Sequence, residues 1–160
     1  MILIALGANL PSPAGPPAAT LRAALARLEQ QGVKIQSVSS FYETPAWPDP
    51  GQPAYINAVA AVETTLQPVE LLALLHGVET DFGRLRSAPN ASRTLDLDLL
   101  DHGGKVMTGG VTLPHPRMTE RSFVLVPLAE IAPGWRHPVT GVGVADLLAR
   151  LPDRAGPRPI

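Results

Sequence analysis

The sequence contains no cysteine among its 160 residues. This excludes disulfide bonds, thiolate metal sites and a cysteine nucleophile, and it is compatible with a reducing compartment. No apolar run approaches the roughly 18 residues that a membrane-spanning helix requires. The apolar start, Met1–Leu6, lacks a basic leader and reaches Gly7 too early for a signal peptide. We therefore expect a cytoplasmic protein with no membrane partner.

Lysine is also scarce: only Lys34 and Lys105 stand among the 13 basic residues, and the formal net charge is −1. A broad non-specific surface for nucleic acid usually shows as a basic excess, so we expect no nucleic-acid partner. The preference for arginine has two interpretations. It follows from the base composition of the genome, or particular arginines hold phosphate with their planar forks.

The common phosphate-binding loops are missing. The sequence has neither a GxxxxGK[ST] segment nor a GxGxxG segment. Phosphate binding in this chain would therefore depend on arginine side chains and a metal ion rather than on a glycine-rich loop.

The apolar fraction of 45% and the chain length predict one globular domain, residues 1–160. Apolar runs and turn residues predict strands over 2–6, 33–41, 55–64 and 95–100, with a hairpin partner over 105–107 after the turn 101–104. Helices are predicted over 16–31 and 68–83, and shorter ones near 122–131 and 144–151. Residues 43–53 and 87–92 are predicted loops. This is the split βαβ order of a ferredoxin-like α+β sandwich, an antiparallel sheet with helices packed on it.

The most informative segment is Arg93–Leu100, which reads RTLDLDLL. In a strand, alternate side chains share a face, so three leucines would point into the core while Asp96 and Asp98 point away together. Such carboxylates favour hard cations such as Mg²⁺, and a pair of ions is common in phosphoryl chemistry. The alternative is an ordinary solvated strand face. Aspartate is depleted in strands, so the pattern is unusual either way.

Arginines flank this strand in the sequence. Arg93 precedes it, and Arg84 and Arg86 follow the second helix. Next to two metal-binding carboxylates, they would hold the remaining charge of a triphosphate. The alternative is that they are solvated surface residues.

A second cluster combines an aromatic ring with a primary amide, because Tyr55 and Asn57 share one face of a predicted strand. A stacking ring beside an amide suits a flat heterocycle. Core packing for Tyr55 and a turn role for Asn57 remain alternatives, and Phe123 taken alone fits the core. His115 lies between two prolines and either donates to a phosphate oxygen or has a structural role.

Several segments, in this order, make the chain resemble the 6-hydroxymethyl-7,8-dihydropterin pyrophosphokinase family. They are Ala5–Leu10, Ser40–Pro45, Tyr55–Val59, Glu79 with Gly83–Arg86, Arg93–Leu100, Leu113–Met118 and Arg121–Leu128. The segment RTLDLDLL is the most specific of them.

The resemblance implies a ferredoxin-like fold, ATP as co-substrate, two Mg²⁺ ions, and transfer of pyrophosphate to a pterin alcohol with release of AMP. It implies that Asp96 and Asp98 bind metal and that Arg84 and Arg93 stabilise the transition state. The triphosphate would be lined by Arg86, His115 and Arg121. The pterin would be bound by Thr44, Pro45, Tyr55, Asn57 and Phe123, with one aromatic ring on each side.

The loop before Arg93 departs from the family pattern, since it lacks the basic residue and tryptophan that many members carry before Gly-Pro-Arg. The departure leaves open how residues 87–92 close over ATP. Two other functions are compatible with the residues alone. One is a magnesium kinase for another alcohol, and the other is a ferredoxin-like nucleotide-binding sensor without catalysis.

Overall fold

The computed structural model describes residues 1–46, 51–83, 94–152 and 156–160. The strands are β1 (Ile2–Ala8), β2 (Lys34–Val38), β3 (Tyr42–Thr44), β4 (Tyr55–Glu63), β5 (Asp96–His102) and β6 (Arg158–Pro159). The helices are α1 (Pro17–Gln30), α2 (Pro68–Asp81), α3 (Ser122–Ile131) and α4 (Val144–Ala149), with a short 3₁₀ turn at Met118–Glu120.

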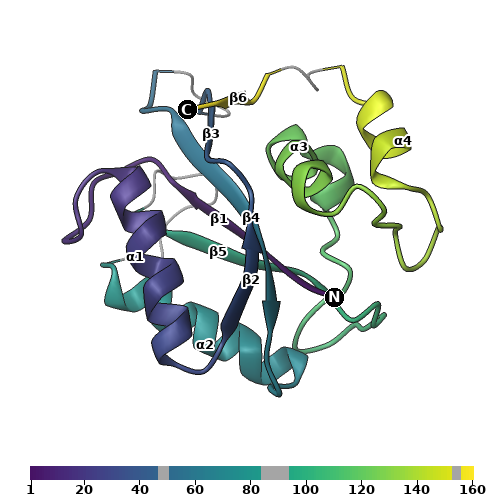
Figure 1. Ribbon diagram of the computed structural model, residues 1–160, viewed down its shortest axis with the longest axis horizontal. Helices are drawn as coiled ribbons and strands as arrows, with labels where there is room; N and C mark the ends of the chain where they lie inside the picture. The colour runs from purple at the N-terminus through teal and green to yellow at the C-terminus, as the bar shows by residue number, and fades with distance from the viewer. Residues whose placement is uncertain (47–50, 84–93, 153–155) are drawn as a thin grey trace.

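All pairings between the strands of the sheet are antiparallel, and β1 lies between β4 and β5. Along the sheet the strands follow in the order β5-β1-β4-β3-β6. The strand β2 also pairs with β4, beside residues 60–63 of that strand. Taken alone, β5, β1, β4 and β2 have the strand order of the predicted ferredoxin-like sandwich. The predicted fold class, an antiparallel sheet with helices packed on it, is confirmed (Figure 1).

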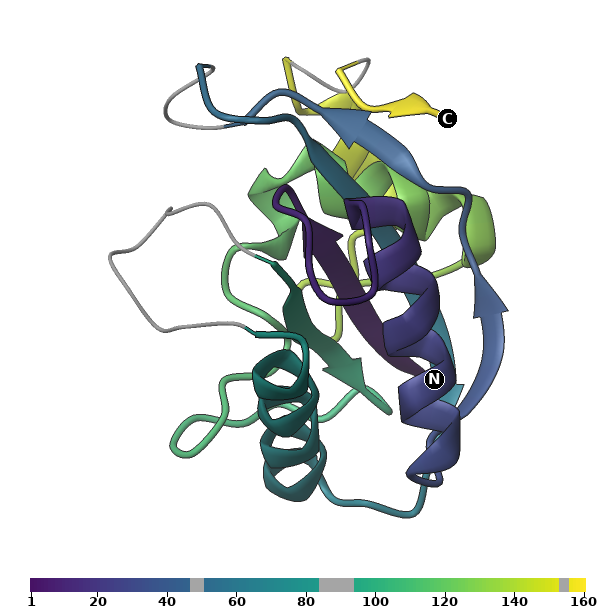
Figure 2. The ribbon, with the colours of Figure 1, turned by 90° about the vertical axis from the view of Figure 1, so that its left-hand side faces the viewer.

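One face of the sheet is mainly apolar. The helices α1 and α2 lie side by side over this face, as Figure 2 shows. Alternate residues of each strand point to this face. The central strands contribute Ile4, Leu6, Ala58, Ala60, Val62, Leu97 and Leu99, and the two helices contribute Leu21, Leu28, Leu71 and Leu75. This core favours the observed register, because a slip of β5 by one residue would turn Asp96 and Asp98 into the core.

The opposite face is divided along the strands into an apolar half and a polar half. Leu3, Val59, Ala61 and Leu100 lie in the apolar half, where α3 covers them and α4 packs beside α3. The polar half carries Gly7 and Asn57 and, on β5, the two aspartates, as the register of the strands requires. The candidate site therefore lies in the polar half of this face, which the apolar core does not occupy.

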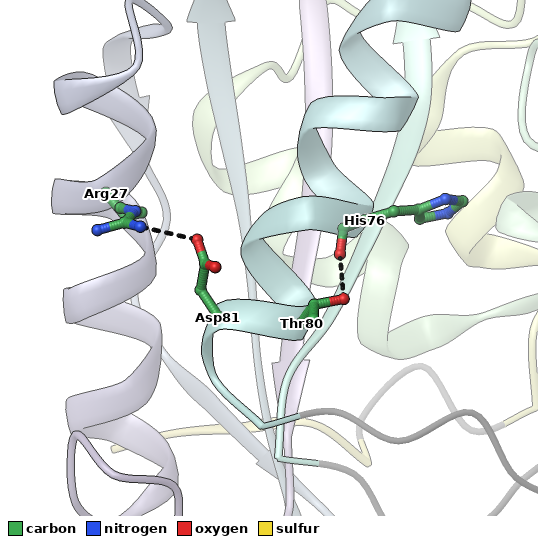
Figure 3. A network of polar contacts seen from close by, with 4 residues as sticks. All are labelled: Arg27, His76, Thr80 and Asp81. Atoms are coloured by element: carbon green, nitrogen blue, oxygen red, sulfur yellow. Dashed lines mark hydrogen bonds and ion pairs between the residues drawn. The ribbon is translucent and has the colours of Figure 1, made fainter.

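The two helices on the apolar face begin and end at the predicted signals. Pro17 and Pro68 stand in the first turns, where a missing N–H costs nothing. Gly83 follows α2 with a φ of +84°, a conformation that favours glycine. Arg27 of α1 contacts Asp81 of α2, with 2.9 Å between Nη2 and Oδ2, and the Thr80 hydroxyl donates to the carbonyl of His76 (Figure 3).

Two predicted strands differ from the structure. The strand predicted over 33–41 stops at Val38, and a separate strand, β3, begins at Tyr42 and runs into the predicted loop over 43–53. Residues 105–107 form no hairpin with β5. The strand β5 continues to His102, and Met107 pairs with Leu113 instead. In the part of the chain that the structure describes, no helix has the length and apolar character needed to span a bilayer.

Candidate active site

One row of residues runs straight across the sheet at the polar half. Asp96 of β5 is the partner of Gly7 on β1, Gly7 is the partner of Asn57 on β4, and Asn57 is the partner of Tyr42 on β3. Directly opposed residues project to the same face of an antiparallel sheet. The register therefore brings the predicted metal-binding strand and the predicted pterin-binding strands onto one surface, with only a glycine between them.

The predicted alternation in β5 is confirmed. Leu95, Leu97 and Leu99 are buried, whereas Asp96 and Asp98 are half-buried. Both carboxylates lie on the face opposite the leucines, as the strand geometry requires. Half-buried carboxylates at alternate positions of a rigid strand are well placed to hold a cation together with a bound substrate.

A buried carboxylate supports this strand from the opposite side. Glu79 of α2 is 2% exposed, and its Oε2 accepts a hydrogen bond of 2.8 Å from the backbone N–H of Leu97. Leu97 lies between the two aspartates, so this bond fixes the backbone that carries them. The sequence indicated no role for Glu79, although a position four residues after Leu75, on the apolar side of α2, is where a buried acid would lie.

Arg121, at the start of α3, connects two predicted subsites. Its Nη1 lies 3.8 Å from Oδ2 of Asp98, and its guanidinium carbon lies 5.5 Å from the centre of the Phe123 ring. The arginine thus lies between a predicted metal ligand and a predicted pterin contact. Phe123 also packs partly against the apolar core under α3, so the core alternative for this residue is correct in part.

His115 lies beside β5, where its backbone N–H donates to the carbonyl of Leu100 at 2.9 Å. Burial, together with the positive charge of Arg121, lowers the pKa of His115 to about 4, and Asp96 opposes this shift. The imidazole is therefore neutral at pH 7. Its Nδ1 accepts the backbone N–H of Arg117 at 3.2 Å. This acceptor role places the single ring proton on Nε2, which can donate to an anionic oxygen.

The predicted pterin contacts come from three elements, β3 with the residue after it, β4 and α3. The Asn57 amide donates to the Thr44 hydroxyl across β4 and β3 at 2.9 Å, and both side chains are buried. Tyr55 is half-buried at the start of β4, and the exposed Pro45 follows β3. Phe123 comes from α3, on the other side of the site. The structure thus brings Thr44 and Asn57 into direct contact. Tyr55 lies two residues before Asn57, Pro45 directly follows Thr44, and Phe123 belongs to α3.

A cavity of about 420 Å³ opens next to Asp98. Its lining shares Asp98 and His115 with the predicted metal and phosphate sites and extends over Leu72, Leu99, Val111 and Thr112. Polar groups and apolar side chains share the lining of this open cavity. A concave site of this kind can bind an organic group. The sequence did not indicate it, because its walls come from α2, β5 and the loop over 109–116, which no local pattern relates.

Three predicted arginines, Arg84, Arg86 and Arg93, lie outside the described residues, as does the loop over 87–92. Their predicted roles therefore remain predictions.

The donor set fits a magnesium ion that is shared with a substrate. Across the parts of the chain that the structure describes, no three His, Cys, Asp or Glu side chains form a group able to hold a metal. Mg²⁺ is usually held by one or two carboxylates, and the phosphates of the substrate and water complete the octahedron. Asp96 and Asp98 supply this incomplete set, which is suitable for Mg²⁺ bound to a nucleotide rather than for a permanent metal centre.

Comparison with known proteins agrees with this arrangement. The family profile described as 7,8-dihydro-6-hydroxymethylpterin-pyrophosphokinase (HPPK) matches residues 3–133. A 2-amino-4-hydroxy-6-hydroxymethyldihydropteridine pyrophosphokinase of Synechocystis sp. is 40% identical over 151 residues, which are 93% of this chain and 75% of the relative. The protein of the same name from Haemophilus influenzae is 42% identical over 131 residues, which are 81% of this chain and 79% of the relative.

The fold has solved counterparts as well. A crystal structure of wild-type Plasmodium falciparum HPPK-DHPS superposes with a TM-score of 0.71 at 15% identity, over 91% of this chain. This chain spans only 40% of that longer polypeptide, so the likeness concerns the fold of one part of it. The profile match over most of the sequence, together with two relatives above 30% identity, places the chain: it belongs to the 7,8-dihydro-6-hydroxymethylpterin-pyrophosphokinase family.

Proposed function

We propose that this chain transfers the pyrophosphoryl group of ATP to the hydroxymethyl group of 6-hydroxymethyl-7,8-dihydropterin, with release of AMP, in folate biosynthesis. The observation that carries the proposal is the row across the sheet. It places Asp96 two strands away from Asn57, on one face, in a chain of the pyrophosphokinase family. One surface can therefore hold a metal-bound triphosphate and a flat heterocycle side by side.

Two Mg²⁺ ions are part of the proposal, with Asp96 and Asp98 as their protein ligands. When bound, the ions neutralise phosphate charge and lower the pKa of the attacking alcohol. The incomplete donor set described above supports a nucleotide-bound metal, because ATP would supply the missing oxygens.

The phosphates would be held by positively charged and neutral donors around the aspartates. Arg121 already lies beside Asp98 and can turn its fork to a phosphate oxygen. His115 would donate its Nε2 proton, and Arg86 would add a further cation. The cavity beside Asp98 and His115 is suited to the adenosine part of ATP, since Leu72 and Val111 give it apolar walls.

The pterin would lie over the other end of the row. Asn57 and Thr44 would bind its polar edge, and their mutual hydrogen bond holds both side chains in place before binding. Tyr55 and Phe123 would stack on the two sides of the ring, and Pro45 would border it.

In the reaction, the pterin oxygen forms a bond to the β-phosphorus as the bond from that phosphorus to the AMP oxygen breaks. The hydroxyl proton passes to water. Arg84 and Arg93 would stabilise the charge that develops on the bridging and transferred oxygens. The protein positions the two substrates and complements this charge, which is the main contribution of an enzyme to phosphoryl transfer.

The proposed unit of function is the single domain of residues 1–160, acting in the cytoplasm. A chain without cysteine needs no oxidising compartment for its fold, which supports this location.

The test is an assay of purified protein with ATP, Mg²⁺ and the reduced hydroxymethylpterin, in which AMP is measured. We expect AMP only when all three are present, and omission of the pterin or of Mg²⁺ provides the two controls. Formation of ADP instead would indicate a kinase for another alcohol. ATP binding without any product, in a folded preparation, would favour the nucleotide-binding sensor.

A further inference from the structure

A carboxylate far from the metal strand accepts several hydrogen bonds at once. Glu130 of α3 accepts from the Tyr42 hydroxyl through Oε1 at 2.6 Å. Through Oε2 it accepts from the backbone N–H of Ser40 at 2.9 Å and from the Ser40 hydroxyl at 3.1 Å. We refer to Glu130, Tyr42 and Ser40 as the α3–β3 latch. Bonds to an ionised acceptor are stronger than neutral ones.

The latch joins the two sides of the proposed pterin pocket. Glu130 follows Phe123 by seven residues, which is close to two helical turns, so both side chains lie on one side of α3. On the sheet, Tyr42 is the direct partner of Asn57 and precedes Thr44 by two residues on β3. The latch therefore fixes the helix that carries Phe123 against the strand that carries Thr44.

The strand β3 needs such support because it is short. It has three residues, it is separated from β2 by residues 39–41, and its outer neighbour is the two-residue strand β6. The backbone of the break is itself held by the latch, at Ser40. The pKa values of the pair are consistent with a strong bond. Burial and the neighbouring carboxylate raise the pKa of Tyr42 to about 12. The hydrogen bonds from Tyr42 and Ser40 outweigh the effect of burial and lower the pKa of Glu130.

We propose that Glu130 is a positioning residue for pterin binding, which holds α3 and β3 at the separation that the pterin requires. The inference rests on the proposed function and goes beyond it, since Glu130 lies at the far end of α3 from Phe123. Without the latch, only a fraction of the molecules has the complete pocket, and the apparent affinity for pterin falls by that fraction. In the proposed arrangement ATP binds at the aspartate strand and in the neighbouring cavity, whose lining includes none of the three latch residues.

The first experiment compares Glu130→Ala with Trp135→Phe. Trp135 also joins the segment after α3 to the sheet, but to β5 rather than β3, through a buried hydrogen bond of 2.9 Å from its Nε1 to Oδ2 of Asp101. We expect Glu130→Ala to raise the Kd for the reduced pterin, measured by calorimetry, about tenfold. Its KM for ATP should change less than about twofold, and Trp135→Phe should leave both values near those of the wild type even if it lowers the melting temperature.

Two milder variants test the same idea if Glu130→Ala does not fold. Glu130→Gln retains an oxygen that can accept from Tyr42 or Ser40, so its pterin Kd should lie between those of the wild type and Glu130→Ala. Tyr42→Phe removes one bond of the latch, and combining it with Glu130→Ala should add little to the effect of Glu130→Ala alone.

The outcomes separate the two proposals. Wild-type protein that binds pterin and forms AMP, with an unchanged pterin Kd in Glu130→Gln and Tyr42→Phe, would overturn the positioning role and leave the function intact. An equal loss of pterin and ATP affinity would assign the latch a general structural role and would overturn the inference too. Wild-type protein that binds no pterin would overturn the proposed function itself.

Discussion

The amide oxygen of Asn57 lies 2.7 Å from the point that a Cβ atom on Gly7 would occupy. No real Cβ approaches an oxygen so closely, so the side chain of Asn57 occupies the space left by the missing Cβ of Gly7. Because Gly7 also faces Asp96 across β1 and β5, this glycine marks the boundary between the two proposed subsites. Its small size keeps the amide close to the sheet.

We expect Gly7→Ala to weaken pterin binding, because the new methyl group must displace the Asn57 amide from its bond with Thr44. A tenfold or larger rise in the KM for pterin, with a smaller change for ATP, is the expected order of magnitude for one lost polar contact. Gly77→Ala is the matched control, because a Cβ at Gly77 on α2 meets nothing within 4 Å. It should leave both KM values unchanged and stabilise the helix by up to about 1 kcal/mol. Equal pterin kinetics in the two variants would contradict the role of Gly7.

Asp96→Asn and Asp98→Asn should each abolish most of the turnover while the protein stays folded. The substitution retains the size of the side chain and removes the charge that binds Mg²⁺, so kcat should fall about a thousandfold or more. Asp146→Asn, on an exposed position of α4, makes the same chemical change away from the site and should have no effect. Circular dichroism would confirm the fold, and full activity in either site variant would remove the metal role of that residue.

His115 should remain neutral until the pH is well below its ordinary range. In the ligand-free protein, NMR titration of its imidazole signals should give a pKa of about 4, compared with 6.5 for an unperturbed histidine. Arg121→Ala should raise this pKa only part of the way, because burial is the larger cause. A folded pKa below the unfolded one means that protonation favours unfolding. The contribution of His115 to stability is thus present above pH 6.5 and is lost as the pH falls toward 4. A titration near 6.5 in the folded protein would contradict this burial.

Arg93→Ala should lower kcat more than it raises the KM for ATP. This follows if the guanidinium stabilises charge that appears only in the transition state. Arg117→Ala, an exposed arginine next to the site, is a suitable control for the loss of one positive charge. A rise in KM with unchanged kcat would instead identify Arg93 as a ground-state binder of ATP.

The sequence predicted the elements whose patterns are local. The leucines of β5 alternate with the aspartates, and proline and glycine mark the ends of α1 and α2, so these elements were predicted close to their true bounds. β3 was missed because three residues before a proline-rich loop carry too little pattern. Its existence depends on pairing with Tyr55–Asn57 of β4, which is a tertiary contact.

The site was predictable to the extent that family motifs carry it. Asp96, Asp98 and Asn57 stand in such motifs, and the register places them on one face. The supporting carboxylates were not predictable in the same way. Glu79 and Glu130 act through contacts with backbone and hydroxyl groups of segments 18 and 90 residues away, which no spacing in the sequence reveals.

The division of one sheet face into a polar and an apolar half has a consequence for deep mutational scanning. Along β1 and β4, even-numbered positions face α1 and α2, so polar substitutions at Ile4, Leu6 or Ala60 should lower cellular abundance. At Gly7 and Asn57, which belong to the proposed site, the same screen should show growth in medium without folate falling further than abundance. Neighbouring positions of one strand would then differ in whether a substitution lowers mainly abundance or mainly growth. The position along the strand at which growth defects give way to abundance defects on the polar face would mark the inner limit of the proposed active site.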